Sequence, residues 1–113
     1  METEEQKKLQ SFVKRPPVAG MVEDIVRCKW SLSVLQLVRQ GVNRPGAMER
    51  NVDGLTTKVL NERLKKLVSY GILQRHAYPE IPPRVEYELT AFGQKFANIL
   101  DEIEKLNQEI END

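Results

Sequence analysis

The sequence predicts a mostly helical α+β fold built as one domain. Three observations predict it. Apolar residues recur at helical spacing through most of residues 18–69, apolar and acidic residues alternate over 84–89, and a long apolar stripe runs from 92 to 110. The length of 113 residues suits one domain, and 40% hydrophobic with 30% charged residues is typical of a folded chain.

The first third of the chain is expected to form short helices. A polar stretch over 4–12 is compatible with a short helix, which Pro16-Pro17 would end because proline disfavours helical backbone before it. A second helix over 18–27 and a third from residue 30 are predicted from their apolar spacing. Their apolar residues are Met21, Val22, Ile25 and Val26, then Trp30, Val34, Leu37 and Val38. We expect Trp30 to anchor the core, and Gly41 to end the third helix.

Two further helices are expected in the middle of the chain. Pro45 suits the first turn of a short helix over 44–50, and residues 52–55 predict a turn. Thr56 is a fitting N-cap for the next helix, and Gly71 is a fitting residue just past its end. The apolar stripe of that helix consists of Leu60, Leu64, Leu67 and Val68.

A β-hairpin is predicted from residues 72–78 and 84–89. The second run alternates apolar and acidic side chains, which indicates a strand with one buried face. The stretch 79–83 contains three prolines, which cannot donate to a strand ladder, so it should form a projecting tip. Thr90 then stands where it can cap the last helix.

The last helix carries an apolar seam with heptad spacing. The seam consists of Phe92, Phe96, Ile99, Ile103, Leu106 and Ile110. A helix packed on its own core could show the same stripe, but from Ile103 onward it should extend past so small a domain. A second copy of the chain is the simplest partner. We therefore expect a homodimer interface at Phe96, Ile99, Ile103, Leu106 and Ile110.

This order of elements predicts a winged helix-turn-helix with a two-stranded β-wing and a long C-terminal helix. We divide the chain into an N-terminal arm with a short helix (1–16), a winged helix-turn-helix DNA-binding domain (17–92) and a dimerisation helix continuous with it (93–113). In this fold the second motif helix enters the major groove of DNA. The wing then reaches the backbone or the minor groove.

The expected DNA-binding residues lie on that helix and on the wing. Thr57, Lys58 and Asn61 would face base edges, because these side chains pair with bases in the major groove. Other cations, Lys66 among them, would hold phosphates. The full set is Thr56, Thr57, Lys58, Asn61, Arg63 and Lys65 on the helix, with Arg75 and Arg84 on the wing.

The charge distribution is compatible with a DNA partner although the formal net charge is zero. Residues 101–113 carry a net charge of −5, whereas residues 9–100 carry +6 and residues 44–84 alone carry +4. Because screening limits the range of each charge to about 8 Å at physiological salt, a basic face can act locally.

No enzyme function, cofactor or metal is expected. The chain has no glycine-rich phosphate loop, dinucleotide fingerprint or metal-ligand spacing, and its single histidine, His76, should be a surface residue. No apolar run is long enough to span a bilayer, and the first residues lack the apolar core of a signal peptide. We therefore expect a cytoplasmic protein without a membrane partner, in which the single cysteine, Cys28, stays a thiol.

Four segments resemble the HxlR-type transcriptional regulators, a winged-helix family. They are residues 22–30, 54–64, 71–75 and, most specifically, 78–93, and together the resemblance covers about residues 17–105. It implies a homodimer that places two recognition helices on a palindromic operator. It also implies a dimer interface of the N-terminal helices and the last helix.

The sequence departs from the family pattern at two places. Arg27-Cys28 replaces the usual Gly-Gly before Lys-Trp, and Pro17 stands where oxidant-sensing members usually carry a cysteine. Pro45-Gly46 replaces the family's phenylalanine and polar residue, which puts the packing angle of that short helix in question.

Two alternative functions remain open at the sequence level. The first is a winged-helix module that binds another protein, for which the proline-rich tip could serve as a docking site. The second is a thiol-responsive repressor switched through Cys28, a candidate redox residue whose neighbours Arg27 and Lys29 would favour the thiolate. A small buried filler is the simpler reading of this cysteine.

Overall fold

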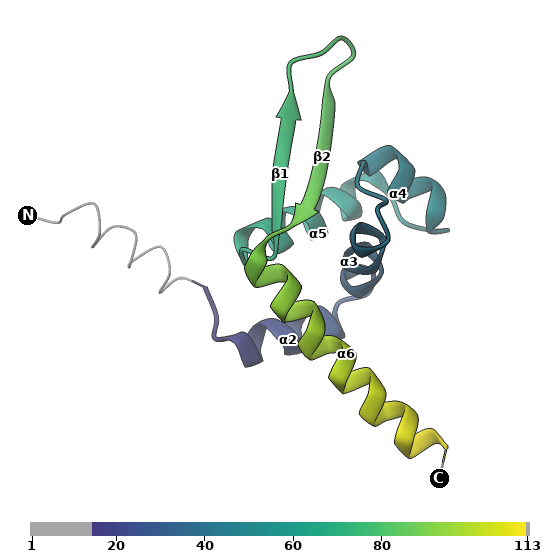
Figure 1. Cartoon of the computed structure of the whole chain (residues 1–113). Coiled ribbons are helices and arrows are strands. Elements are labelled where there is room, and N and C mark those ends of the chain that lie inside the picture. The colour runs from purple at the N-terminus through teal and green to yellow at the C-terminus, as the bar shows by residue number, and fades with distance from the viewer. Residues whose placement is uncertain (1–14, 113) are drawn as a thin grey trace, which may run out of the picture.

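The computed structural model describes residues 15–112, which form five helices and one two-stranded sheet (Figure 1). The short helix expected over 4–12 lies outside the described residues. The elements, in order, are α2 (Val18–Arg27), α3 (Ser31–Arg39), α4 (Pro45–Asn51), α5 (Thr57–Ser69), β1 (Leu73–Tyr78), β2 (Arg84–Leu89) and α6 (Ala91–Glu111). This confirms the predicted winged helix-turn-helix, in which β1 and β2 form the wing.

Two predicted threonine caps fix where α5 and α6 begin. The Thr56 hydroxyl accepts the Val59 amide at 3.2 Å, and the Thr90 hydroxyl accepts the Gly93 amide at 2.8 Å. Each bond satisfies an amide that would otherwise lack a partner in the first helical turn. At the end of α5, Gly71 adopts a φ of 76°, a conformation that favours glycine.

The wing is an antiparallel hairpin whose base is anchored to the helices. Its register pairs Leu73 with Leu89 and Tyr78 with Arg84. The first strand begins one residue later than predicted, because the Ile72 amide donates to the Leu67 carbonyl at the end of α5, at 3.0 Å, instead of joining the ladder. The remainder of the hairpin projects away from the helical body (Figure 1).

One hydrophobic core joins α2, α3, α4, α5, the base of the wing and the first half of α6. Its fully buried members include Ile25, Leu35, Leu60, Leu64 and Phe96. The predicted helical stripes supply about half of this core. Leu35, Met48 and Leu100 are buried helical residues that the stripes omitted, and Val26, which was predicted in the stripe of the helix over 18–27, is 52% exposed. Trp30 packs against the core only partly buried, with φ at 81° and the Lys29 ammonium 4.6 Å from its ring centre.

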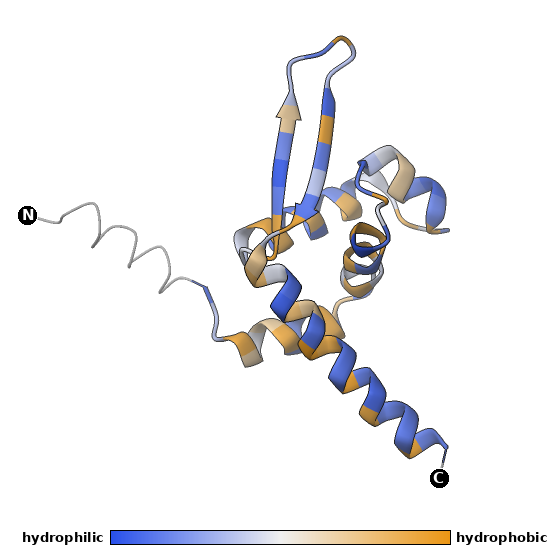
Figure 2. Cartoon of the chain, viewed as in Figure 1, coloured by the Kyte–Doolittle hydropathy of each residue, from blue (hydrophilic) through white to orange (hydrophobic). Residues whose placement is uncertain are grey.

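The second half of α6 extends beyond the core. Figure 2 shows apolar residues recurring along this part of the helix, whose last turns have no other element beside them. Leu106 is 60% exposed and Ile110 is 73% exposed. The radius of gyration is 16.0 Å, against about 13 Å for a compact domain of 100 residues. The projecting wing and α6 account for the difference.

Candidate nucleic-acid interface

The outer face of α5 is polar and accessible. Leu60, Leu64 and Leu67 turn inward and are at most 1% exposed, so the opposite side of the helix must face solvent. We call the exposed residues on that side the reading face: Thr57, Lys58, Asn61, Glu62 and Lys65. Thr57 donates a hydrogen bond to Glu49 of α4, which ties the first turn of α5 to the preceding helix.

A recess lies between this face and the wing. It encloses about 680 Å³ and is lined by Lys58, Asn61, Glu62, Lys65, Val68, Arg75 and Tyr87. Arg75 reaches it from β1, where it is paired with Tyr87 and exposed to solvent. The recess therefore brings together four of the predicted DNA-binding residues, which are Lys58, Asn61, Lys65 and Arg75. The carboxylate of Glu62 lines the same recess.

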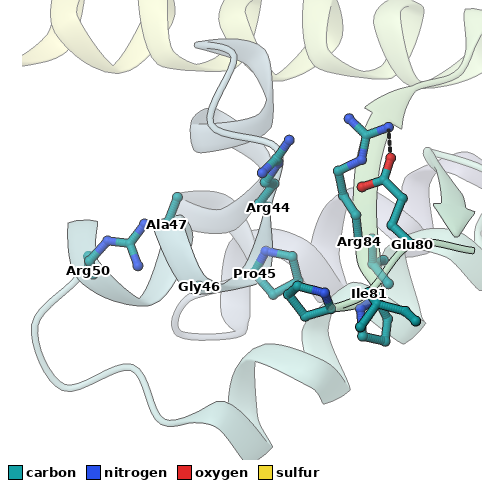
Figure 3. Close-up of a pocket in the computed structure, with 11 residues that line it drawn as sticks. Arg44, Pro45, Gly46, Ala47, Arg50, Glu80, Ile81 and Arg84 are labelled. Atoms are coloured by element: carbon teal, nitrogen blue, oxygen red, sulfur yellow. Dashed lines mark ion pairs between the residues drawn. The ribbon is translucent and has the colours of Figure 1, made fainter. Parts of the chain in front are cut away.

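A second groove lies between α4 and the wing tip (Figure 3). It encloses about 590 Å³, and its cationic side chains are Arg44, Arg50 and Arg84. Ile81 at the tip is fully exposed. Arg44 and Arg50 were not among the predicted DNA-binding residues; the basic excess over residues 44–84 was the signal that could have indicated them.

Arg84, predicted to contact DNA, is engaged within the wing. Its guanidinium stacks 3.9 Å from the Tyr78 ring centre and pairs with Glu80 at 3.0 Å and Glu86 at 2.9 Å. Figure 3 shows the pair with Glu80 at the edge of the groove. Arg44 lies 3.5 Å from the same Glu86 carboxylate and is 56% exposed. Arg84 therefore stiffens the wing, and Arg44 is the more accessible cation.

Two other predicted phosphate contacts lie away from the recess. The Arg63 side chain donates to the Lys29 carbonyl at 3.3 Å, and Lys66 pairs with Asp24 at 3.2 Å. Both face the α2 side of α5, where they fix the helix against the body. Thr56 is exposed, and its hydroxyl serves as the cap of α5.

Asp24 joins α2 to the C-terminal part of α5. Its carboxylate accepts hydrogen bonds from the Tyr70 hydroxyl, from Lys66 and from the Cys28 thiol, the last at 3.2 Å. The bond from Tyr70, with smaller contributions from Cys28 and Lys66, holds the pKa of Asp24 below its ordinary value. Burial, reinforced by Asp24, raises the pKa of Tyr70 to about 12. This network holds α5 at a fixed position on α2.

Cys28 occupies the C-terminal cap of α2 and is half-buried. Its thiol proton is directed at the Asp24 carboxylate. The two cations expected to act on it have other contacts: Arg27 pairs with Glu23 at 3.1 Å, and Lys29 lies over Trp30. The geometry gives Cys28 a structural role in the α2–α5 network.

The α6 seam divides into a buried part and an exposed part. Phe96, predicted to lie at the dimer interface, is 1% exposed and packs in the core of its own chain, because the first half of α6 covers that core. Ile103 is half-buried, whereas Ile99, Leu106 and Ile110 are 43–73% exposed. Val26 of α2 and Leu32 of α3, also exposed, line a cleft with α6.

Neither a metal centre nor a membrane segment emerges from the described residues. Across residues 15–112, no three histidine, cysteine or acidic side chains are grouped so that they could bind a metal ion. Over the same residues, no helix is long and apolar enough to cross a bilayer.

Comparisons with known proteins agree with this geometry. A family model described as HxlR-like helix-turn-helix matches residues 25–113. An uncharacterized HTH-type transcriptional regulator of Synechocystis sp. is 42% identical over 88 residues, which cover 78% of this chain and 65% of the relative. The chain thus spans slightly less than two thirds of that relative. The HTH-type transcriptional regulator YvaP of Bacillus subtilis is 42% identical over 83 residues, covering 73% of this chain and 76% of YvaP.

Among solved structures, a regulator from Enterococcus faecalis assigned to the MarR family superimposes with a TM-score of 0.75. It is 28% identical to this chain, and the match covers 99% of this chain and 93% of that one.

Proposed function

This chain belongs to the HxlR-like helix-turn-helix family and is a transcriptional regulator of the winged-helix type, and from that premise we propose how it acts. It binds a palindromic operator as a homodimer, with α5 of each protomer in a major groove and each wing on the backbone or in the minor groove. The observation that carries this proposal is the α5 recess, where exposed lysine, asparagine and arginine side chains converge.

The residues of the recess suit two kinds of DNA contact. Lysine can donate to the O6 and N7 atoms of guanine, and asparagine can pair with both N6 and N7 of adenine. Lys58 and Asn61 stand on the first turns of α5, the part of a recognition helix that contacts bases. Lys65 and Arg75, which also line the recess, hold phosphates and so position the helix.

The dimer is proposed to form through the exposed apolar side chains of α6. Ile99, Leu106 and Ile110 are large, apolar and exposed, and Ile103 continues the same seam. Pairing this surface with a second copy would remove it from water and would place two recognition helices in one particle. Two-fold symmetry of the particle then requires a palindromic site.

A matched pair of triple variants tests the proposal. The combination Lys58→Ala, Asn61→Ala and Arg75→Ala should reduce affinity for a selected operator by at least a hundredfold, because two base contacts and one phosphate contact are lost. The combination Lys95→Ala, Asn98→Ala and Lys105→Ala removes two cations and one asparagine from exposed positions on α6. It should bind as the wild type does.

Equal operator binding by the wild type and the recess variant would contradict the proposal. A chain that retains no DNA at low salt but retains a protein partner would favour the protein-interaction module instead.

A further inference from the structure

We propose that Glu62 recognises cytosine and so sets part of the base preference of this regulator. This role rests on the proposed DNA-binding function, and Glu62 is not among the DNA-binding residues predicted from the sequence. The Glu62 carboxylate contacts the cytosine of a C·G base pair in the major groove, and Lys58 contacts the guanine of the same pair.

Glu62 lies at one edge of the reading face, on the side of α5 that points directly away from the core. At about 100° per residue, Glu62 lies about 160° around the helix from Leu60, the side chain that is fully buried. On the same count, Lys58 is about 40° from Glu62 and one turn closer to the N-terminus. The two opposite charges therefore stand next to each other at the most outward point of α5.

The Glu62 carboxylate is available for a ligand. Among residues 15–112, no hydrogen bond or ion pair engages it, and its side chain is exposed. The other glutamates near this interface are engaged: Glu49 with Thr57, Glu80 with Arg84, and Glu86 with Arg84 and Arg44. Among the described residues, Glu62 is thus the acidic side chain of the recess whose carboxylate makes no hydrogen bond or ion pair.

A carboxylate at this position discriminates among bases by its chemistry. It only accepts hydrogen bonds, so phosphates and the O6 and N7 atoms of guanine repel it. Cytosine presents its N4 amino group as a donor in the major groove, whereas adenine sets the N7 acceptor beside its N6 donor. Of the four bases, cytosine is therefore the one that offers a carboxylate a hydrogen-bond donor with no acceptor atom of the same base beside it.

The neighbouring cations make this contact favourable. Lys58 and Lys65 stand four residues before and three residues after Glu62, spacings at which side chains on a helix are neighbours. Their positive charge offsets the loss of water around the carboxylate when DNA closes the recess. Because a C·G pair presents a donor on cytosine and acceptors on guanine, the adjacent Glu62 and Lys58 match both halves of it.

Selection of bound sequences from a random DNA pool tests the assignment. The wild type should enrich a palindrome in which one position of each half-site is cytosine. In Glu62→Gln that cytosine preference should fall about tenfold and adenine should rise at the same position, because glutamine pairs with adenine N6 and N7. The control Glu111→Gln removes the same charge from the exposed end of α6 and should return the wild-type motif.

Two outcomes separate an error about Glu62 from an error about the function. If Glu62→Gln enriches the same palindrome with the same cytosine preference, Glu62 does not recognise a base, although the protein still binds DNA. A uniform gain in affinity on all sequences would likewise show that Glu62 only repels phosphates. If the wild type enriches no sequence at all, the proposed function fails together with this inference.

Discussion

At the scale of single residues, Lys58 carries the clearest prediction for DNA binding. It is exposed on the first turn of α5 and lines the recess. Lys58→Ala should make the free energy of binding to the selected operator less favourable by about 1–3 kcal/mol, because a donor to guanine is lost. Fluorescence anisotropy titrations on the operator and on a scrambled duplex measure it.

The control for this variant is Lys95→Ala, which removes an exposed lysine from α6. An equal loss on the operator and the scrambled duplex, with a salt slope smaller by about one, would assign Lys58 to a phosphate instead.

Gly93 carries a prediction for stability. It is buried in the first turn of α6, and a methyl group there would overlap the carbonyl of Ile72. Gly93→Ala should therefore lower the free energy of unfolding by about 2–3 kcal/mol, because the helix must shift away from the wing. Urea unfolding followed by circular dichroism measures the change.

The control for Gly93 is Gly46→Ala in α4. A methyl group at Gly46 meets only the Arg50 guanidinium, at 3.6 Å. This variant should be as stable as the wild type or slightly more stable, by up to about 1 kcal/mol. Wild-type stability for Gly93→Ala would contradict the packing described for α6.

The Asp24 network predicts a pH dependence of stability. The folded chain holds the pKa of Asp24 below the ordinary value of 3.8, chiefly through Tyr70. A lowered carboxyl pKa stabilises the fold above the unfolded value, and this contribution is lost as the pH falls through the folded value. Tyr70→Phe should cost about 1–2 kcal/mol near neutral pH, and the cost should shrink below about pH 4.

Urea unfolding of the two proteins across this pH range measures that difference. Tyr78→Phe removes a hydroxyl from the exposed wing and is the control. A cost for Tyr70→Phe that is the same at all pH values would show that the tyrosine contributes packing and not the bond to Asp24.

Sequence patterns predict a residue well when its role is local, and poorly when its partner is distant in the chain. Thr56 and Thr90 could be predicted as caps because each bonds to an amide three residues later. Arg63 and Arg84 are cations on the predicted elements, but their partners, Lys29 and Tyr78 among them, follow from how elements pack. Composition alone therefore overestimated the number of free cations at the interface.

At the scale of elements, α6 shows what periodicity leaves undetermined. The seam from Phe92 to Ile110 keeps one spacing throughout, yet Phe96 lies in the core and Ile110 is 73% exposed. The point where the core ends depends on the other elements, and the bidentate pair of Arg39 with Asp101, at 2.7 and 2.9 Å, marks it. Ile103 just beyond that pair still packs against the core, whereas the last turns of α6 have no other element of the described chain beside them (Figure 1).

The exposed half of α6 predicts how the dimer can be weakened. The pair Leu106→Ser and Ile110→Ser should raise the monomer fraction in sedimentation equilibrium, because it removes two large apolar side chains from the proposed interface. Both residues lie after the Arg39–Asp101 pair, so the core of each protomer and its unfolding transition should be unchanged.

The control on the same helix is Asn107→Ser with Gln108→Ser, between the two seam positions. An unchanged dimer in the seam variant would place the interface on the exposed residues of α2 and α3.

At the scale of the whole molecule, the zero net charge results from two regions of opposite sign. The acidic residues 101–113 carry −5, and the segment 44–84, which holds α4, α5 and most of the wing, carries +4. The wing and the C-terminal end of α6 project from opposite ends of the molecule (Figure 1). Since charges more than about 8 Å apart are largely screened at physiological salt, the acidic end does not cancel the basic face.

This separation predicts a strong salt dependence of DNA binding by a protein without net charge. If the dimer contacts about six phosphates, the slope of log K against log salt should be about −5. Glu109→Gln with Glu111→Gln at the end of α6 should change affinity less than about twofold at 150 mM salt and more at 20 mM, where the screening length is longer. Titrations at five salt concentrations measure both effects. A flat slope, or an equal effect of these variants at both salt concentrations, would mean that the total charge and not its distribution governs binding.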